Sequence, residues 1–248
     1  MSYCLGIKTA EGLVLASDSR TSAGDQVSVC QKMHLFVMPG ERVFVLVTSG
    51  SLSLSQSVVT LLRTDFDAGI GLAAAPTLYD AARVVGATVR RVGEIDREFL
   101  ERDKLSFNVH FIMGGQIKGE EHDLYLIYPQ GNPLRASTDA PFLQIGETKY
   151  GRPILDRGIK YDSTPLVMAS KYALISIDST MRSNMTVGPP VDMLLYETDS
   201  LQVTHHRRLI ASDPDLKEIH TRWEQSLRRA VSELPAVQFE KVENDIED

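Results

Sequence analysis

The residues best suited to chemistry stand at the start of the chain, where Ser2 follows Met1. A serine that begins a chain carries a hydroxyl and an α-amine on one residue, and a free α-amine titrates at about 7.7 to 8.0. Removal of Met1 would therefore give Ser2 a nucleophile and a proton acceptor together. Retention of Met1 would block the amine, and a Met-Ser pair alone is also an ordinary chain start. The residues that fold next to Ser2 must decide between the two interpretations.

Two predicted hairpins position further polar residues. Apolar runs over 3–8 and 13–17 flank a turn at 9–12, a pattern typical of a β-hairpin. Folding the chain back there places Asp18 alongside Ser2, although the turn leaves the register open by one residue. A second hairpin is predicted over 34–38 and 42–47, and Lys32 comes just before it. The course of residues 21–31 does not follow from the sequence.

The remaining elements predict alternating pairs of strands and helices. Apolar periodicity predicts helices over 51–66, 77–99, 164–181 and 213–234, and strands over 107–113, 124–128, 191–196 and 201–209. Thr77 is the expected N-cap of the second helix. The apolar face of this helix, which extends to Ile95 and Phe99, should pack on a sheet. Two stacked sheets covered by helices on both outer faces follow from this order, an α+β fold with four αββα layers.

Length and composition bound the class of protein. The chain has 248 residues, of which 43% are hydrophobic, so we expect one domain over 1–235. Five acidic residues against one lysine within 240–248 indicate an acidic C-terminal tail over 236–248. The sequence contains no run of about 18 apolar residues and no secretory signal pattern. We therefore expect a cytoplasmic protein without a membrane partner.

The net charge and the number and spacing of the cysteines limit the kinds of partner and cofactor that we expect. A formal net charge of −7 disfavours nucleic acid as a partner. Cys4 and Cys30 fit no metal-binding or disulfide pattern, so we interpret both as buried structural thiols. The adjacent His205 and His206 would point to opposite faces of a strand and cannot readily share one metal ion. No metal and no cofactor are expected.

Several motifs resemble the proteasome β-subunit and its N-terminal nucleophile hydrolase relatives. The matching segments are Gly12-Leu13-Val14-Leu15-Ala16-Ser17-Asp18-Ser19-Arg20, Lys32-Met33, Thr48-Ser49-Gly50, Met113-Gly114-Gly115, Gly146 and the segment 151–158. A narrower set of segments resembles the bacterial ancestral β-subunit group, Anbu: Ser2-Tyr3-Cys4, Ser17-Asp18-Ser19-Arg20-Thr21, the run 178–184 and the acidic C-terminal extension. The resemblance covers most of the chain and implies the four-layer sandwich of N-terminal nucleophile hydrolases.

The resemblance also assigns roles to residues. Ser2 takes the place of the family's N-terminal threonine, and Lys32 matches the lysine that lowers the pKa of the amine and stabilises the developing alkoxide. Asp18 matches the partner that fixes Lys32, and the Gly50 amide matches the oxyanion donor. Apart from the resemblance, Asp18 and Lys32 could form a surface pair worth about 0 to 1 kcal/mol. Gly50 could likewise be a plain strand-to-helix connector.

Two departures from the family pattern concern residues that support the nucleophile. Many proteasome subunits hold a serine after a glycine near the nucleophile, but here Gly146 is followed by Glu147, with Thr148 as the candidate substitute. The later Arg-Asp-x-x-Ser pattern is Arg182-Ser183-Asn184-Met185-Thr186 here, without the aspartate. Ser183 and Thr186 could keep some of the hydrogen bonds. These changes put the rate and the accepted substrate in question.

Three functions follow as hypotheses. The leading one is a proteasome-like peptidase that cleaves peptide or protein substrates through an acyl-ester on Ser2, within a self-assembled ring or helical stack. The alternatives are a weak or inactive proteasome-like scaffold and a hydrolase of small amides, because related folds host different functions. The sequence has no phosphate-binding ATPase loop, so energy-driven unfolding would need a separate ATPase partner.

Overall fold

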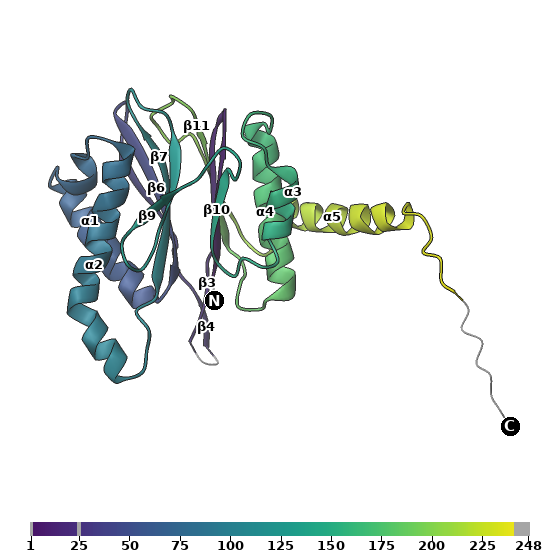
Figure 1. Cartoon of the computed structure of the whole chain (residues 1–248), viewed down its shortest axis with the longest axis horizontal. Coiled ribbons are helices and arrows are strands. Elements are labelled where there is room, and N and C mark those ends of the chain that lie inside the picture. The colour runs from purple at the N-terminus through teal and green to yellow at the C-terminus, as the bar shows by residue number, and fades with distance from the viewer. Residues whose placement is uncertain (1, 24–25, 241–248) are drawn as a thin grey trace.

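The computed structural model describes residues 2–23 and 26–240, which form two stacked antiparallel sheets between layers of helices (Figure 1). The strands are β1 (Tyr3–Thr9), β2 (Gly12–Asp18), β3 (Arg20–Ala23), β4 (Gln26–Val29), β5 (Met33–Met38), β6 (Arg42–Gly50), β7 (Val109–Ile117), β8 (Asp123–Ile127), β9 (Pro133–Arg135), β10 (Phe142–Gly146), β11 (Val191–Glu197) and β12 (His205–Leu209). The α-helices are α1 (Leu52–Asp67), α2 (Leu78–Arg102), α3 (Arg152–Gly158), α4 (Leu166–Ser183) and α5 (Pro214–Ser232), with a 3-10 turn at Gly71–Ala73.

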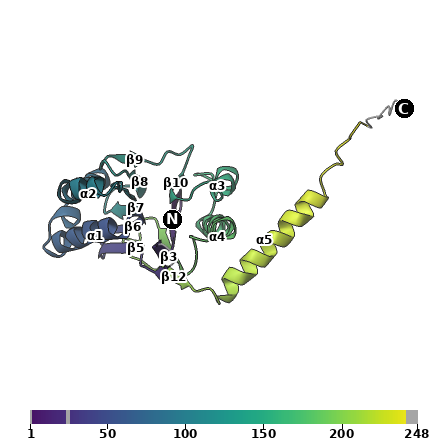
Figure 2. The same ribbon diagram turned by 90° about the horizontal axis from the view of Figure 1, so that it is seen from below.

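The layers follow the order helices, sheet, sheet, helices (Figures 1 and 2). One sheet has the strand order β10-β1-β2-β11-β12 and is covered by α3 and α4, while the other has the order β5-β6-β7-β8-β9 and is covered by α1 and α2. Three apolar cores fill the interfaces: one under each helical layer and one between the sheets, where Cys4, Leu15 and Val47 pack. The predicted αββα sandwich is confirmed.

The first hairpin has the register that the site requires. Strands β1 and β2 pair Cys4 with Ser17, which sets Tyr3 beside Asp18. The Tyr3 amide donates to Asp18 Oδ1 at 3.0 Å. The prediction that Asp18 lies alongside the start of the chain is therefore confirmed.

Several local predictions were wrong. The apolar face of α2 does not pack throughout, since Ile95 and Phe99 are 60% and 61% exposed where the last turns of the helix extend beyond the sheet (Figure 1). The final strand begins at His205 rather than at residue 201, because the backbone at Asp199 and Leu201 has positive φ values of 61° and 45° and cannot continue an extended strand. Cys30 is only half-buried, unlike Cys4.

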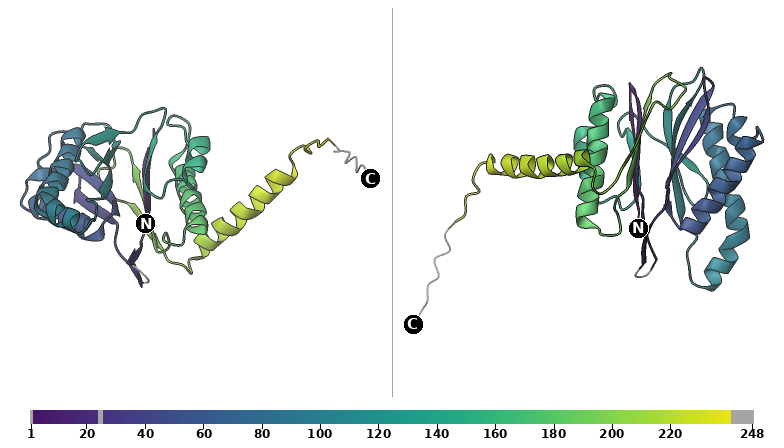
Figure 3. Two further views of the ribbon diagram at one scale, coloured as in Figure 1. Left: turned by 60° about the horizontal axis from the view of Figure 1, so that its bottom comes forward. Right: turned by 180° about the vertical axis from the view of Figure 1, so that it is seen from behind.

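Three other segments have structure that the sequence did not indicate. Residues 20–23 and 26–29 form a separate two-stranded ribbon, β3 and β4, that extends below the sandwich (Figure 3). The strands β9 and β10 lie at sheet edges and are short, which weakens their periodic signal. Strand β10 pairs with β1 and carries the chain back to Ser2.

Helix α5 projects away from the sandwich (Figures 1 and 3). It is held to α4 by His220 Nδ1, 2.9 Å from Asp178 Oδ1, and by Glu224, 3.0 Å from Arg182. Its capping Asp213 side chain accepts from the Asp215 amide, as the predicted helix start requires. Across residues 2–23 and 26–240, no helix combines the length and apolarity needed to cross a membrane.

Candidate functional site

A buried ion pair contacts Tyr3, the residue that follows Ser2. Lys32 Nζ donates to Asp18 Oδ1 at 2.6 Å and to the Arg20 carbonyl at 2.6 Å, and the side chains are 4% and 0% exposed. The same Asp18 oxygen accepts the Tyr3 amide, so Asp18 links the lysine to the residue that follows Ser2. The hairpin β1–β2 positions Asp18, and the approach to β5 positions Lys32. The alternative of a surface pair is wrong, because both charges are buried.

Two glycines permit close backbone approach at the site. Gly146 has φ +86°, and a Cβ there would lie 1.9 Å from the Ser2 carbonyl oxygen. Gly50 has φ +112°, and a Cβ there would lie 2.3 Å from the Asn108 carbonyl oxygen. Both positions therefore require glycine for conformation and for space.

The Gly50 amide faces the same edge of β6 as the Thr48 amide. Amides two residues apart in a strand point the same way, and the Thr48 amide donates to the Lys32 carbonyl at 3.0 Å. Strand β5 begins only at Met33, so the ladder ends near this point. A Gly50 donor at this edge lies on the side of the strand where Lys32 enters.

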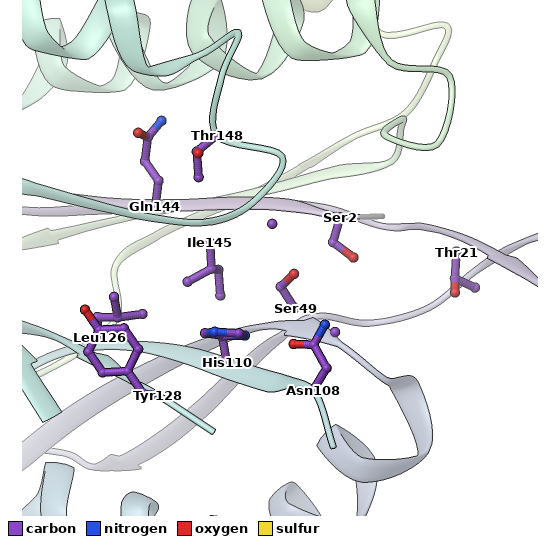
Figure 4. A pocket seen from close by; sticks show the side chains of 12 residues that line it. Ser2, Thr21, Ser49, Asn108, His110, Leu126, Tyr128, Gln144, Ile145 and Thr148 are labelled. Carbon is purple, nitrogen blue, oxygen red and sulfur yellow. The ribbon is translucent and has the colours of Figure 1, made fainter. Parts of the chain in front are cut away.

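A cavity of about 440 Å³ opens between the two sheets at Ser2. Ser2, Thr21, Ser49, Gly50, Asn108, His110, Leu126, Tyr128, Gln144, Ile145, Gly146 and Thr148 line it. Figure 4 shows the Ser2 and Ser49 hydroxyls pointing into the same space, with Asn108 and His110 across from Ser2. The lining has no carboxylate and no lysine or arginine, so it suits an uncharged group.

Burial shifts the pKa of Asp18 and Cys4 near Ser2 and of His110 in the cavity. Burial raises the pKa of Asp18, opposed by the Lys32 ammonium and by hydrogen bonds from Lys32 and the Tyr3 and Gly188 amides. Burial also raises the pKa of the Cys4 thiol, which keeps it protonated and unreactive beside Lys32. Burial lowers the pKa of His110, so the imidazole in the cavity is neutral at pH 7.

The predicted supporting residues occupy different environments. Thr148 lines the cavity. Thr186 donates from its hydroxyl to Asn184 Oδ1 at 2.6 Å and is partly buried. Ser183 is exposed at the end of α4, and no hydrogen bond found among the described residues joins its hydroxyl to the site.

Sequence reasoning missed several cavity residues. Asn108 directly precedes β7, His110 lies in β7 and Tyr128 directly follows β8. All three line the cavity. Glu147 was noted only as a departure from the family pattern, yet its carboxylate accepts from Asn184 Nδ2 at 3.0 Å. Its position directly after Gly146 was the signal that could have found it.

Within the described part of the chain, no group of three or more His, Cys, Asp or Glu residues is arranged to hold a metal ion.

Comparison with known proteins points to one family. No family model matches the chain. Two curated proteins named proteasome subunit beta are 26% identical to this chain, one from Haloquadratum walsbyi over 205 residues and one from Haloferax volcanii over 206 residues. Each match covers 82% of this chain and 76% of the relative. The solved structure of Anbu (ancestral beta-subunit) from Yersinia bercovieri matches with a TM-score of 0.90 and 41% identity, over 96% of this chain and 100% of that chain.

A second solved structure gives the same result. The helical assembly of the Anbu complex from Pseudomonas aeruginosa matches with a TM-score of 0.90 and 43% identity, over 95% of this chain and 98% of that chain. The four-layer fold and these similarities together define a proteasome-like N-terminal nucleophile hydrolase scaffold. At this identity over nearly its whole length, the chain belongs to the Anbu group of proteasome β-subunit relatives.

Proposed function

We propose that this protein is a peptidase that cleaves amide bonds with Ser2 as the first residue of the chain. The Ser2 hydroxyl attacks the substrate carbonyl carbon while the Ser2 α-amine accepts the hydroxyl proton, directly or through a water. The amide C–N bond then breaks, the proton passes to the leaving amine, and an acyl-ester remains on Ser2. Water hydrolyses the ester and restores the free hydroxyl.

The neighbouring residues have defined roles in this proposal. The Lys32 ammonium favours the neutral form of the amine and stabilises the developing alkoxide, and Asp18 fixes Lys32. The Gly50 amide donates to the tetrahedral oxyanion, a hydrogen bond typically worth about 2.7 to 4 kcal/mol of barrier. The single observation that supports the proposal most is that one Asp18 oxygen accepts from both Lys32 and the Tyr3 amide, next to a cavity that contains Ser2.

The cavity favours peptides with an uncharged side chain next to the cleaved bond. His110 is neutral because burial lowers its pKa, and it adjoins Tyr128 with ring centroids 6.4 Å apart. A charged side chain would lose its hydration there without gaining an opposite charge. The cavity lies between the sheets, so a folded substrate would need a separate unfolding ATPase.

The test of this function is intact-protein mass spectrometry of a chain that begins at Ser2. The chain is incubated with a peptide electrophile selective for N-terminal nucleophiles, and the adduct is mapped to a residue. One adduct on Ser2, absent in Ser2→Ala, is the expected result. A folded wild-type chain that forms no adduct at any pH between about 6 and 9 would overturn the proposal.

One observation favours the scaffold alternative. The position that holds an aspartate in the Arg-Asp-x-x-Ser pattern is Ser183, which is exposed and is not among the residues that line the cavity. If that aspartate were indispensable, the chain would assemble without cleaving peptides. The same mass-spectrometric experiment decides between the two functions, since a scaffold forms no Ser2 adduct.

We also propose that the chain assembles with copies of itself through its C-terminal extension. We propose that the chain consists of one domain over residues 1–235 and an acidic C-terminal tail over residues 236–248. The projecting α5 and the residues that follow it expose apolar side chains: Leu227, Val231, Leu234, Val237 and Phe239. Apolar surface of this kind is typical of a protein contact. Sedimentation velocity should show a smaller assembly when residues 236–248 are deleted, and an unchanged sedimentation coefficient would contradict this role.

A further inference from the structure

A buried glutamate pairs with Ser2 through its backbone, at a position where the family pattern has a serine. The Glu147 amide donates to the Ser2 carbonyl oxygen at 2.8 Å, so Glu147 is the residue directly opposite Ser2 across β1 and the end of β10. Glu147 is only 5% exposed. A buried acidic residue from another segment of the chain thus pairs with Ser2, while the aspartate of the Arg-Asp-x-x-Ser pattern is absent.

Asn184 fixes the orientation of this carboxylate. Asn184 Nδ2 donates to Glu147 Oε2 at 3.0 Å, and Asn184 Oδ1 in turn accepts from the Thr186 amide at 3.0 Å and the Thr186 hydroxyl at 2.6 Å. Both ends of the Asn184 amide group are thus engaged, which defines its orientation. The other carboxylate oxygen, Oε1, has Lys149 Nζ at 3.7 Å, and that lysine is 77% exposed.

The segment that carries Asn184 is tied to the catalytic ion pair. The Gly188 amide donates to Asp18 Oδ2 at 3.2 Å, and the Gly188 carbonyl accepts from the Ser19 and Arg20 amides. The Arg20 guanidinium donates to the Met185 carbonyl at 2.6 Å. Asp18 therefore contacts Lys32 through one oxygen and the Asn184 segment through the other.

We propose that Glu147, oriented by Asn184, is the positioning residue for the Ser2 α-amine. This inference rests on the proposed function of Ser2 as an N-terminal nucleophile. The carboxylate replaces the missing aspartate of the Arg-Asp-x-x-Ser pattern, and its charge stabilises the protonated amine that forms when the hydroxyl gives up its proton. Lys32 and Glu147 then act on the amine in opposite directions, one favouring its neutral form and the other its protonated form.

The charge of Glu147 has a measurable consequence that its packing does not. An opposite charge within about 4 to 6 Å shifts a pKa by about one unit or more toward the charged form. In Glu147→Gln the side chain keeps its size and can still accept from Asn184, but the charge is gone. The pKa of the Ser2 amine should therefore fall by about one unit, and the amine becomes a weaker proton acceptor.

The experiment measures the amine directly in full-length chains that begin at Ser2. Trace acetylation with acetic anhydride at a series of pH values, followed by peptide mass spectrometry, gives the pKa of the Ser2 amine whether or not the protein is a hydrolase. In parallel, the rate of Ser2 adduct formation with the electrophile is recorded against pH. The wild type is compared with Glu147→Gln, Glu147→Asp, Asn184→Ala and, as a matched control, Asp156→Asn, which removes an exposed carboxylate from α3.

The expected result is specific to each variant. Glu147→Gln lowers the amine pKa by about one unit, moves the acid limb of the rate profile to lower pH and reduces the plateau rate about tenfold, which is less than the about 10²- to 10⁴-fold contribution of a general base itself. Glu147→Asp retains much of the pKa, because it retains the charge. Asn184→Ala shifts the pKa in the same direction by a smaller amount, and Asp156→Asn leaves it unchanged.

Two outcomes separate this inference from the proposed function. An amine pKa that is the same in wild type, Glu147→Gln and Asn184→Ala would overturn the role of Glu147, even if Ser2 forms its adduct. An amine pKa that depends on Glu147 in a chain that forms no adduct would instead overturn the peptidase and leave the role of Glu147 in place. If Glu147→Gln does not fold, Asn184→Ala still decides the matter, because it lowers the amine pKa only if the orientation of Glu147 matters.

Discussion

Two buried lysine–aspartate pairs lie at opposite ends of strand β1, and their surroundings differ. At one end Lys32 and Asp18 are 2.6 Å apart, with side chains 4% and 0% exposed. At the other end Lys8 and Asp123 are 3.0 Å apart, with side chains 6% and 5% exposed. By distance and burial alone the two pairs are nearly equivalent.

The second pair is surrounded by structural partners. One Asp123 oxygen accepts from Lys8 and from the Leu124 amide, and the other accepts from Arg135. The Lys8 ammonium also lies 5.5 Å from the centre of the Tyr161 ring. The Asp18–Lys32 pair instead contacts Tyr3, the residue after Ser2, and Ser2 itself lines a cavity. A buried ion pair alone is therefore weak evidence of a functional site, and what it touches next decides its role.

The largest effect is predicted for a substitution that removes the carboxylate charge from the Lys8–Asp123 pair. Asp123→Asn leaves the Lys8 ammonium buried without a carboxylate, which should lower the free energy of unfolding by about 3 to 5 kcal/mol. The rate of Ser2 adduct formation per folded molecule should stay within about twofold of wild type. Urea titration and adduct kinetics in native buffer measure both. A stable variant with slow adduct formation would show that the two pairs are not functionally distinct.

A smaller effect is expected at the glycine that we propose as oxyanion donor. Gly50→Ala places a Cβ against the Asn108 carbonyl at a φ of +112°, which must displace the amide. Adduct formation should slow about 10²- to 10³-fold, the typical effect of losing one such donor. Gly40→Ala is the matched control, because Gly40 also has a positive φ of +77° but open space around it. Equal rates in both variants would contradict the role of Gly50.

The smallest effect concerns His34, a partly buried base on β5. Burial lowers the pKa of His34 to about 4, with the Arg63 charge adding to the shift. The folded pKa is below the unfolded value of about 6.5, so the stabilisation is complete above pH 6.5 and is lost as pH falls toward 4. The loss amounts to at most about 3 kcal/mol.

His34→Gln tests this pH dependence, because glutamine does not titrate. Urea titrations at pH 7 and pH 4.5 should show a smaller fall in the free energy of unfolding for the variant than for the wild type. The two ion pairs should be insensitive to the substitution, since neither contacts His34 in the described hydrogen bonds. The same fall in both proteins would exclude His34 as its source.

The sequence predicted the parts of the site that depend on local pairing. The turn at 9–12 and the apolar runs around it were enough to place Asp18 beside the start of the chain to within one residue, and the structure fixed the register. The resemblance to proteasome β-subunits supplied Lys32 and Gly50. The layer order followed from alternating pairs of strands and helices.

Contacts between distant segments could not be predicted in the same way. Glu147 meets Ser2 only because β10, a short edge strand, pairs with β1, and it meets Asn184 only because α4 ends there. The Lys8–Asp123 pair likewise joins strands of different sheets. No periodic pattern in one sequence encodes such contacts, and the exposed turns of α2 show that periodicity alone does not say where a sheet ends.

The most direct test of the account compares the two lysines in one assay. The rate of Ser2 adduct formation is measured by intact-protein mass spectrometry for wild type, Lys32→Ala and Lys8→Ala in chains that begin at Ser2, with each rate expressed per folded molecule. We predict that Lys32→Ala loses at least about 10²-fold while Lys8→Ala stays within about twofold of wild type. Equal rates in the two variants, whether fast or slow, would contradict the claim that only the pair beside Ser2 serves the reaction.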